Sequence, residues 1–170
     1  MKINHLSKQI LIFLALIFVV FGTFYLGRNV EVEQTSNVKR SDLGTLKGPT
    51  LAIGNLIINL EIADTPELRT LGLSGHSPLS DSEGMLFVFE KVSAYHFWMK
   101  DMLFPLDIIW LEVDESNKEG SIVDISRNVL PESYPKSFSP SVPVRYVLEV
   151  NANLTERNNW KIGDRLKLSI

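Results

Sequence analysis

Apolar and polar residues are arranged differently in the first thirty residues and in the rest of the chain. Residues 10–26, ILIFLALIFVVFGTFYL, form an unbroken apolar run of 17 residues without a charge. This length is near the minimum for a helix that spans a bilayer, and it exceeds the apolar part of most cleavable signal peptides. No small-residue cleavage site follows. We therefore expect an uncleaved transmembrane signal anchor at 10–26, with a cleaved signal as the alternative.

The segments on either side of this run are polar. Residues 1–9 form a short basic leader with Lys2 and Lys8, and residues 27–48 are of mixed charge without sustained periodicity. Lys and Arg are nearly balanced across the run, but a short basic leader is typical of a signal anchor. We predict that 27–48 is a flexible tether and that 49–170 is an extracytoplasmic domain, held to the membrane through 10–26.

From residue 49 onward the apolar residues alternate with polar ones in short runs, as in β-strands. One short helix is expected from Pro66, capped by Thr65 and ended by Gly72, with Leu68 and Leu71 on its buried side. The strands are expected at 51–62 (bent, or a hairpin at Gly54-Asn55), 83–90, 93–101, 106–113, 121–125, 145–150 and after a Gly163-Asp164 turn. A long Pro-rich loop is expected at 127–143. The pattern predicts a mostly β, single-domain barrel or sandwich with one short helix.

Composition excludes several classes of function. There is no cysteine, so disulfides, thiol nucleophiles and cysteine-bound metals are absent. From residue 49 the chain has 11 Lys and Arg against 17 Asp and Glu, with no basic run. Nucleic-acid binding requires a basic surface, so we predict none. No glycine-rich nucleotide motif occurs, and we predict no cofactor.

The segment 95–110, YHFWMKDMLFPLDIIW, places charges within the most apolar part of the domain. Asp107 begins a row of alternate residues that continues through Ile109 and Leu111. A buried carboxylate needs a cation or several N–H donors. Asp107 therefore either ties down the backbone of the preceding turn, or pairs with Lys100 beside Trp98 at the mouth of a pocket.

Other candidate chemistry depends on the same few residues. Asp107 and Glu149 could form a pair of carboxylates for acid–base catalysis, or could be the ion-pair partners of Lys100 and Arg145 respectively. His76 and His96 have no metal-ligand spacing, so no metal site is predicted. Most aromatic residues of this set are expected in the core, but some could line a groove for a sugar or an apolar ligand. The set comprises Trp98, Trp110, Phe104, Tyr95 and Tyr134.

Five motifs occur in a characteristic order: GMLFVFE, HFWMKD, PLDIIW, YVLEV and GDRLKL. Together they resemble the domain-of-unknown-function 192 family over Leu56 to Leu168. The resemblance implies a compact, mostly β fold that is often exported or membrane-anchored, and it brings no established activity. The positions that match the family pattern include Trp98, Lys100, Asp107, Glu149 and Asp164. The chain departs at His76, near a family arginine, and at Asp101-Met102, where the family has Asn-Thr.

These observations favour a binding or accessory module centred on Trp98, Lys100 and Asp107, with His96 and Glu149 as further candidate ligand-binding residues. One alternative is a hydrolase or lyase that uses Asp107 and Glu149 with Lys100. Another is a structural envelope protein that binds a protein partner through 127–143.

Overall fold

The computed structural model describes residues 48–170. The expected leader, the transmembrane anchor at 10–26 and nearly all of the tether lie outside the described residues. Within residues 48–170, no helix is long and apolar enough to cross a membrane.

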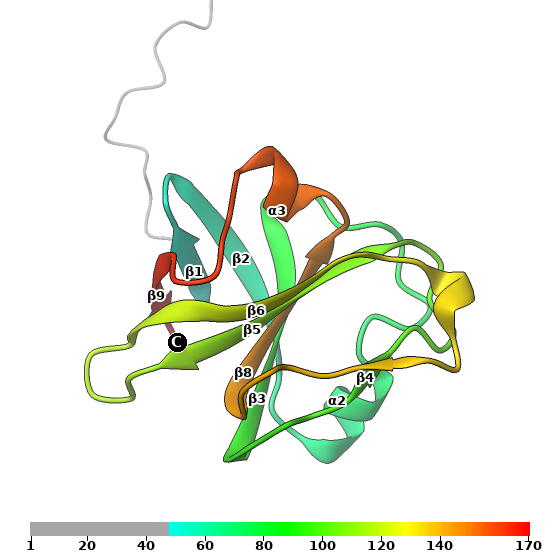
Figure 1. The fold of residues 1–170 in the computed structure, drawn as a ribbon, viewed down its shortest axis with the longest axis horizontal. Helices are drawn as coiled ribbons and strands as arrows, with labels where there is room; N and C mark the ends of the chain where they lie inside the picture. Colours follow the sequence, from blue (N-terminus) through cyan, green and yellow to red (C-terminus); the bar gives the residue numbers. More distant parts are fainter. Residues whose placement is uncertain (1–47) are drawn as a thin grey trace, which may run out of the picture. The chain divides into compact units, whose positions relative to one another are not determined.

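Seven strands close into a barrel in the order β1-β2-β3-β8-β5-β6-β9 (Figure 1). Neighbouring strands are antiparallel except β2 and β3, which are parallel. The strands are β1 Thr50–Ile53, β2 Leu56–Ala63, β3 Glu83–Ser93, β5 Leu106–Val113, β6 Glu119–Val129, β8 Val144–Asn151 and β9 Arg165–Ser169. The prediction of a mostly β single domain is confirmed, and of the two predicted architectures the barrel is the one observed.

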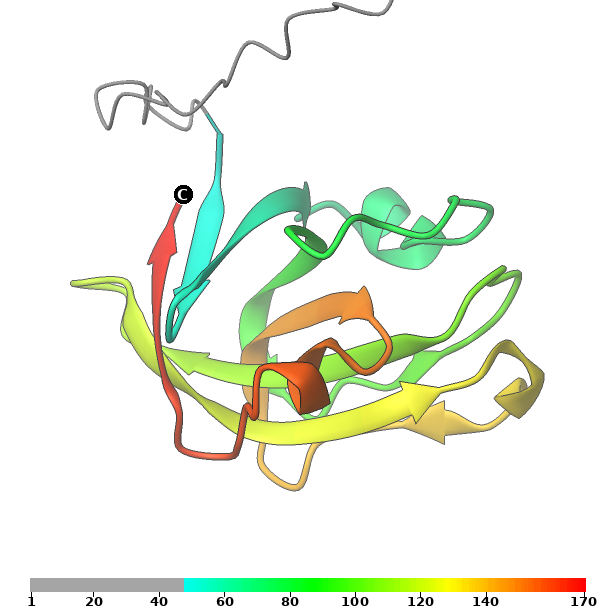
Figure 2. The ribbon, with the colours of Figure 1, turned by 90° about the horizontal axis from the view of Figure 1, so that it is seen from above.

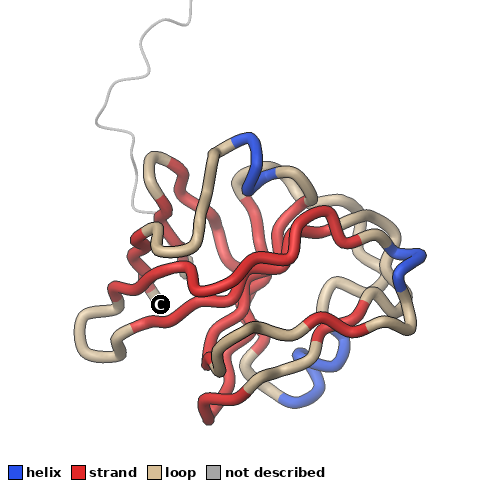
Figure 3. The backbone as a smooth tube through the Cα atoms, viewed as in Figure 1, coloured by secondary structure: helices blue, strands red, loops and turns tan. Residues whose placement is uncertain are grey.

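Shorter elements lie outside the barrel wall (Figure 3). Helix α2, Pro66–Leu71, connects the parallel strands β2 and β3, and α3, Leu154–Arg157, follows β8. A 3-10 turn covers Pro131–Ser133, and β4, Phe97–Trp98, pairs with β7, Ser137–Phe138. Helix α2 lies on the side of the barrel away from the C-terminal end of β9 (Figure 2).

The sequence signals for α2 are confirmed in detail. The Thr65 hydroxyl accepts a hydrogen bond from the Leu68 N–H, Pro66 occupies the first turn, and Gly72 caps the C-terminus. The orientation was predicted wrongly, because Leu68 and Leu71 are 40% and 55% exposed. In this six-residue helix it is Arg69 that turns toward the barrel: its guanidinium donates to the carbonyls of Asp64 and Val88.

Three other boundaries differ from the sequence prediction. The expected strand 93–101 is divided, because β3 continues to Ser93 and only Phe97–Trp98 pairs again. Strand β6 continues to Val129, so the predicted loop 127–143 contains the end of β6, the 3-10 turn and β7. Helix α3 was not predicted, since its four residues carry no periodic apolar signal.

Alternation along the strands supplies two hydrophobic cores. One fills the barrel and receives side chains from all seven strands, including Ile109 and Leu111 of β5. The other covers the outer face of β3, β5 and β8, and includes Leu106, Ile108 and Trp110. The predicted division of β5 into two rows is therefore confirmed. Because both faces are covered, β5 is buried from Leu106 to Leu111.

Asp107 lies on the barrel-interior row of β5 and is fully buried. Its Oδ1 accepts from the backbone N–H of Asn128 at 2.8 Å and of Asn153 at 3.2 Å. Its Oδ2 accepts from the N–H of Thr155 at 3.0 Å and from the Thr155 hydroxyl at 2.7 Å. The carboxylate thus joins β5 to the end of β6 and to the start of α3. Neither the preceding turn nor Lys100 is its partner, so both predicted arrangements were wrong.

We expect Asp107→Asn to lower the free energy of unfolding by roughly 3 kcal/mol or more. The amide NH2 would replace an oxygen that accepts two hydrogen bonds. Two buried donor groups would then lie against the NH2 group, which is itself a donor. Urea denaturation of the full chain measures this. Asp64→Asn is the control, because Asp64 is exposed and its carboxylate has no partner among the described residues; it should stay within about 0.5 kcal/mol. A loss below about 1.5 kcal/mol for Asp107→Asn would contradict the assigned role.

Candidate functional site

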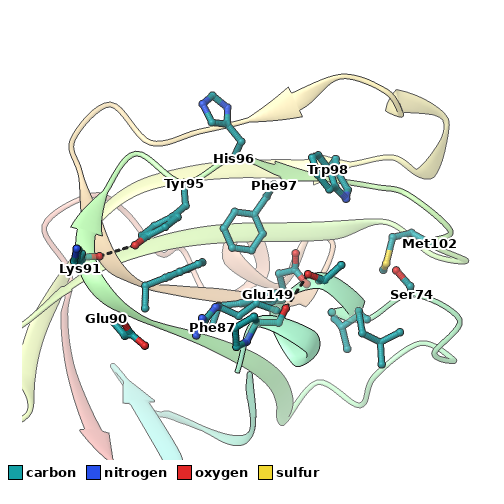
Figure 4. Close-up of a pocket in the computed structure, with 17 residues that line it drawn as sticks. Ser74, Phe87, Glu90, Lys91, Tyr95, His96, Phe97, Trp98, Met102 and Glu149 are labelled. Carbon is teal, nitrogen blue, oxygen red and sulfur yellow. Dashed lines mark hydrogen bonds between the residues drawn. The ribbon is translucent and has the colours of Figure 1, made fainter. Parts of the chain in front are cut away.

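An open pocket of 630 Å³ lies between α2, the second half of β3 and the segment around β4 (Figure 4). Its floor includes Glu149 of β8, which reaches the outer face of the barrel wall. The side chains that line it include Arg69, Phe87, Phe89, Tyr95, His96, Phe97 and Trp98. The pocket is thus formed by elements that are distant in sequence and that the barrel brings together.

Hydrogen bonds to backbone carbonyls hold the pocket walls in place. Arg69 donates to the carbonyls of Asp64 at 2.6 Å and Val88 at 2.8 Å, with its guanidinium carbon 5.2 Å from the centre of the Phe89 ring. These contacts fix α2 against β3. Both hydrogen bonds are donated by Nη1, so this end of the guanidinium is held in the wall of the pocket.

The turn after α2 is joined to the turn after β4. The Ser74 hydroxyl donates to the Lys100 carbonyl at 3.0 Å, and the Gly75 N–H donates to the Asp101 carbonyl at 3.1 Å. Asp101 has φ +57°, in the left-handed region that Asn and Asp tolerate better than other non-glycine residues. Aspartate therefore suits the geometry of this turn.

Aromatic side chains make up much of the apolar lining. The rings of Phe87 and Phe97 meet edge to face at 4.9 Å, and those of Phe89 and Tyr95 stack at 3.5 Å. The Tyr95 hydroxyl donates to the Lys91 carbonyl, so this ring is held at the outer end of the pocket. Trp98 is 52% exposed and forms the rim.

Glu149 differs from every other polar residue of the pocket. It is only 4% exposed, and no residue of the described chain donates a hydrogen bond or forms an ion pair to its carboxyl group. In the sheet it lies between Met85 of β3 and Ile108 of β5, both part of the outer core. Burial raises the pKa of Glu149 to about 8, so at neutral pH the group is mostly a protonated acid.

The structure brings together three of the five candidate residues. Trp98, His96 and Glu149 line the pocket, while Lys100 lines an adjoining hollow of 490 Å³ that shares the Trp98 rim. His96 is exposed, with its Nδ1 3.4 Å from the Ser137 hydroxyl. Asp107 lies on the opposite face of the barrel wall, so the predicted Asp107–Glu149 pair of carboxylates is not formed.

Arg145 was the alternative partner for Glu149, and this pairing is also not observed. Its guanidinium instead donates to the Phe89 carbonyl and, at 3.0 Å, to Glu115 at the β5–β6 turn. The two residues share a face of β8, but four residues of strand separate their Cα atoms by about 13 Å. Glu149 is thereby left without a cation. Elsewhere in residues 48–170, no three His, Asp or Glu side chains are grouped so that they could hold a metal ion.

Sequence reasoning missed the part of the site supplied by α2 and by the end of β3. Arg69, Leu71 and Phe89 line the pocket, yet they were assigned to surface or core positions or not considered. The available signal was Phe89, which continues the apolar alternation of Met85 and Phe87 on the outer face of β3.

We expect Glu149→Gln to flatten the pH dependence of stability. The folded-state pKa lies near 8, above its usual 4.5, so the folded protein holds the proton more tightly than the unfolded chain. In the native protein, tighter proton binding adds to the free energy of unfolding. This addition is fully present below pH 4.5, falls by about 1.4 kcal/mol per pH unit, and is lost above pH 8. Glutamine cannot ionise, so the stability of the variant rises relative to that of the native protein as the pH increases from 4.5 to 8.

Urea midpoints measured from pH 4 to 9 give this difference. Glu61→Gln is the matched control, since Glu61 is exposed on β2, opposite Met85 in the sheet, and should leave the pH profile unchanged. Parallel profiles for the native protein and Glu149→Gln would show that Glu149 is hydrated or paired.

Comparison with known proteins places this fold among uncharacterised domains. A crystal structure of a protein of unknown function from Novosphingobium aromaticivorans DSM 12444 matches with a TM-score of 0.62 and 28% identity, over 70% of this chain and 83% of that one. A proposed transcription regulator from Sinorhizobium meliloti 1021 matches with a TM-score of 0.62 and 31% identity, over 71% and 91%. No curated protein matches the sequence.

The family model that matches covers the whole barrel. It spans residues 50–168, from the first residue of β1 to the next-to-last of β9, and describes the family DUF192, "Uncharacterized ACR". The GMLF, PLDIIW and YVLEV motifs correspond to β3, β5 and β8, and of these strands β3 and β8 contribute residues to the pocket. The chain therefore belongs to the DUF192 family, as its sequence motifs indicated.

Proposed function

We propose that the domain is a small-molecule-binding module and that its site is the pocket above Glu149. One observation supports this most strongly: a buried carboxyl group without a protein partner forms part of the floor of an open, aromatic-lined pocket. Binding sites typically combine an apolar lining with a few polar groups that orient the ligand. Trp98 at the rim and Glu149 at the floor have these two roles.

The cost of Glu149 to the fold supports a binding role. A buried carboxyl group without a hydrogen bond destabilises the folded state, whereas an apolar side chain of similar size would extend the outer core. Proteins keep such costly groups mainly where function requires them. A ligand that supplies the missing hydrogen-bond or charge partner would recover this free energy.

The alternatives have less support from the geometry. A hydrolase or lyase using Asp107 and Glu149 would need both carboxyl groups on one surface, and Asp107 is on the other face with its lone pairs occupied. The segment 127–143, suggested for partner binding, is partly strand and 3-10 turn. We do not extend to this chain the regulator role proposed for the Sinorhizobium protein, because the domain has an acidic balance and no basic run.

We further propose that residues 10–26 anchor the chain in a membrane, with the domain outside the cytoplasm. The support is the uncharged apolar run and its basic leader. The full chain should remain with membranes after alkaline carbonate washing, and alkaline phosphatase fused after Ile170 should be active. Release by carbonate, or an inactive fusion, would contradict the anchor or its orientation respectively.

Ligand binding is tested with the full chain in an uncharged maltoside detergent. We expect a fragment library, screened by ligand-observed NMR, to give binders that Trp98→Ala weakens about 3- to 10-fold, the effect of one aromatic contact of about 0.5–1.5 kcal/mol. Leu103→Ala is the control, because Leu103 is 69% exposed and does not line the pocket. The proposal fails if no fragment binds, or if Trp98→Ala and Glu149→Leu leave all binding unchanged.

A further inference from the structure

Building on the proposed binding role, we infer that the pocket recognises an organic ammonium cation, with the positive nitrogen at Glu149 and the attached alkyl groups against the aromatic lining. The inference concerns the class of ligand, which the family assignment leaves open. It depends on three properties of the pocket: an unpaired acid, the absence of an internal cation, and the density of aromatic rings.

The first property is the missing partner of Glu149. Among residues 48–170, the ion pairs within 4.0 Å are Lys118–Glu115, Arg145–Glu115 and Arg157–Asp81, and none involves Glu149. A carboxyl group in an apolar surround favours a positive partner, because the attraction between opposite charges is strong where water is excluded. The fold supplies the acid, Glu149, and leaves the position of its cationic partner open toward the pocket.

The second property is that the neighbouring cations do not fill this role. Besides Glu149, the ionisable side chains that line the pocket are Arg69 from α2, Glu90 and Lys91 from β3, and Tyr95 and His96 from the segment before β4. Arg69 donates to two carbonyls and covers the Phe89 ring. Lys91 and His96 are exposed, at the outer part of the pocket in Figure 4, whereas Glu149 is only 4% exposed.

The third property is the set of aromatic rings in the same pocket as the acid. Phe87, Phe97 and Trp98 line the pocket together with Tyr95, while the Phe89 ring is already in contact with Tyr95 and Arg69. The faces of such rings carry partial negative charge and attract organic cations, most strongly when the cation is desolvated. A carboxylate combined with several rings suits an ammonium group that carries alkyl substituents better than it suits a metal ion, which needs several oxygen ligands.

The protonation of Glu149 provides a signature of this chemistry. A cation binds the ionised acid, so binding at neutral pH must release the proton that Glu149 carries. With a pKa of about 8, most of one proton should be released per cation bound at pH 7. Affinity should rise about tenfold per pH unit up to pH 8 and level off above it. A neutral ligand held by the protonated acid shows the reverse dependence.

The test compares ligands of equal shape and different charge. Choline and its uncharged analogue 3,3-dimethylbutan-1-ol form one pair, and butylammonium and butan-1-ol form the other. Each is titrated by calorimetry into the full chain in maltoside detergent, in buffers of different ionisation enthalpy, at pH 6, 7, 8 and 9. We expect at least one cation to bind ten times or more tightly than its neutral analogue, with proton release at pH 7.

Two variants connect the result to the pocket. Glu149→Gln keeps the size of the side chain and should lose at least tenfold in cation affinity together with the proton release. Glu61→Gln, an exposed acid outside the pocket, should change neither. Equal affinities within both pairs, no binding of either cation, or proton release that persists in Glu149→Gln would each overturn the inference. Fragment binding that depends on Trp98 and Glu149 would in those cases still support the proposed binding function.

Discussion

The pairing of β5 with β8 places two carboxylic acids on opposite faces of one barrel wall. In this register Asp107 is opposite Val150 and Ile108 is opposite Glu149, so the two acids are one step apart along the ladder. Because side chains alternate across a strand, that single step sends Asp107 into the barrel and Glu149 to the outer face. The same constraint divides the apolar residues of both strands between the two cores.

The two acids differ in their hydrogen-bond partners, and this difference gives Asp107 a structural role and Glu149 a binding role. Asp107 accepts four hydrogen bonds from three residues, so its burial costs little and holds β6 and α3 to β5. Glu149 accepts none from the protein and lies where α2 and the β4 segment leave the outer face open. The Asp107 carboxylate stabilises the fold, whereas the Glu149 carboxyl group is free to bind a ligand.

Much of the fold could be predicted from the sequence, because helix caps, strand alternation and turns each depend on residues that are close together in the chain. The Thr65-Pro66 cap, the alternation along β5 and the Gly163 turn are all set by neighbouring residues, and all are observed. The requirement of Asp107 for several donors was also predictable. Which donors it finds was not, since Asn128, Asn153 and Thr155 are 21, 46 and 48 residues away. Such partners depend on strand order, which periodicity does not reveal.

The candidate site was predictable in part for the same reason. Trp98, His96 and Glu149 were identified from the residue types in two motifs, and the barrel brings them to one pocket. Lys100 and Asp107 lie within the motifs HFWMKD and PLDIIW, but the turn after β4 and strand alternation direct them elsewhere. The isolation of Glu149 could not be predicted, because it depends on which side chains α2 and the β4 segment bring to the outer face, and these are distant from β8 in sequence.

The binding role depends on Glu149 being a buried, unpaired acid at the floor of the pocket. The most direct measurement is a carbon NMR titration of the full chain labelled at the glutamate side-chain carboxyl carbons, with Glu149→Gln used to assign the resonance. We expect one glutamate to titrate near pH 8 and its resonance to be absent from the variant. A Glu149 resonance that titrates near its usual pH of 4.5 would mean that water or a protein group already satisfies the acid, and would contradict the account.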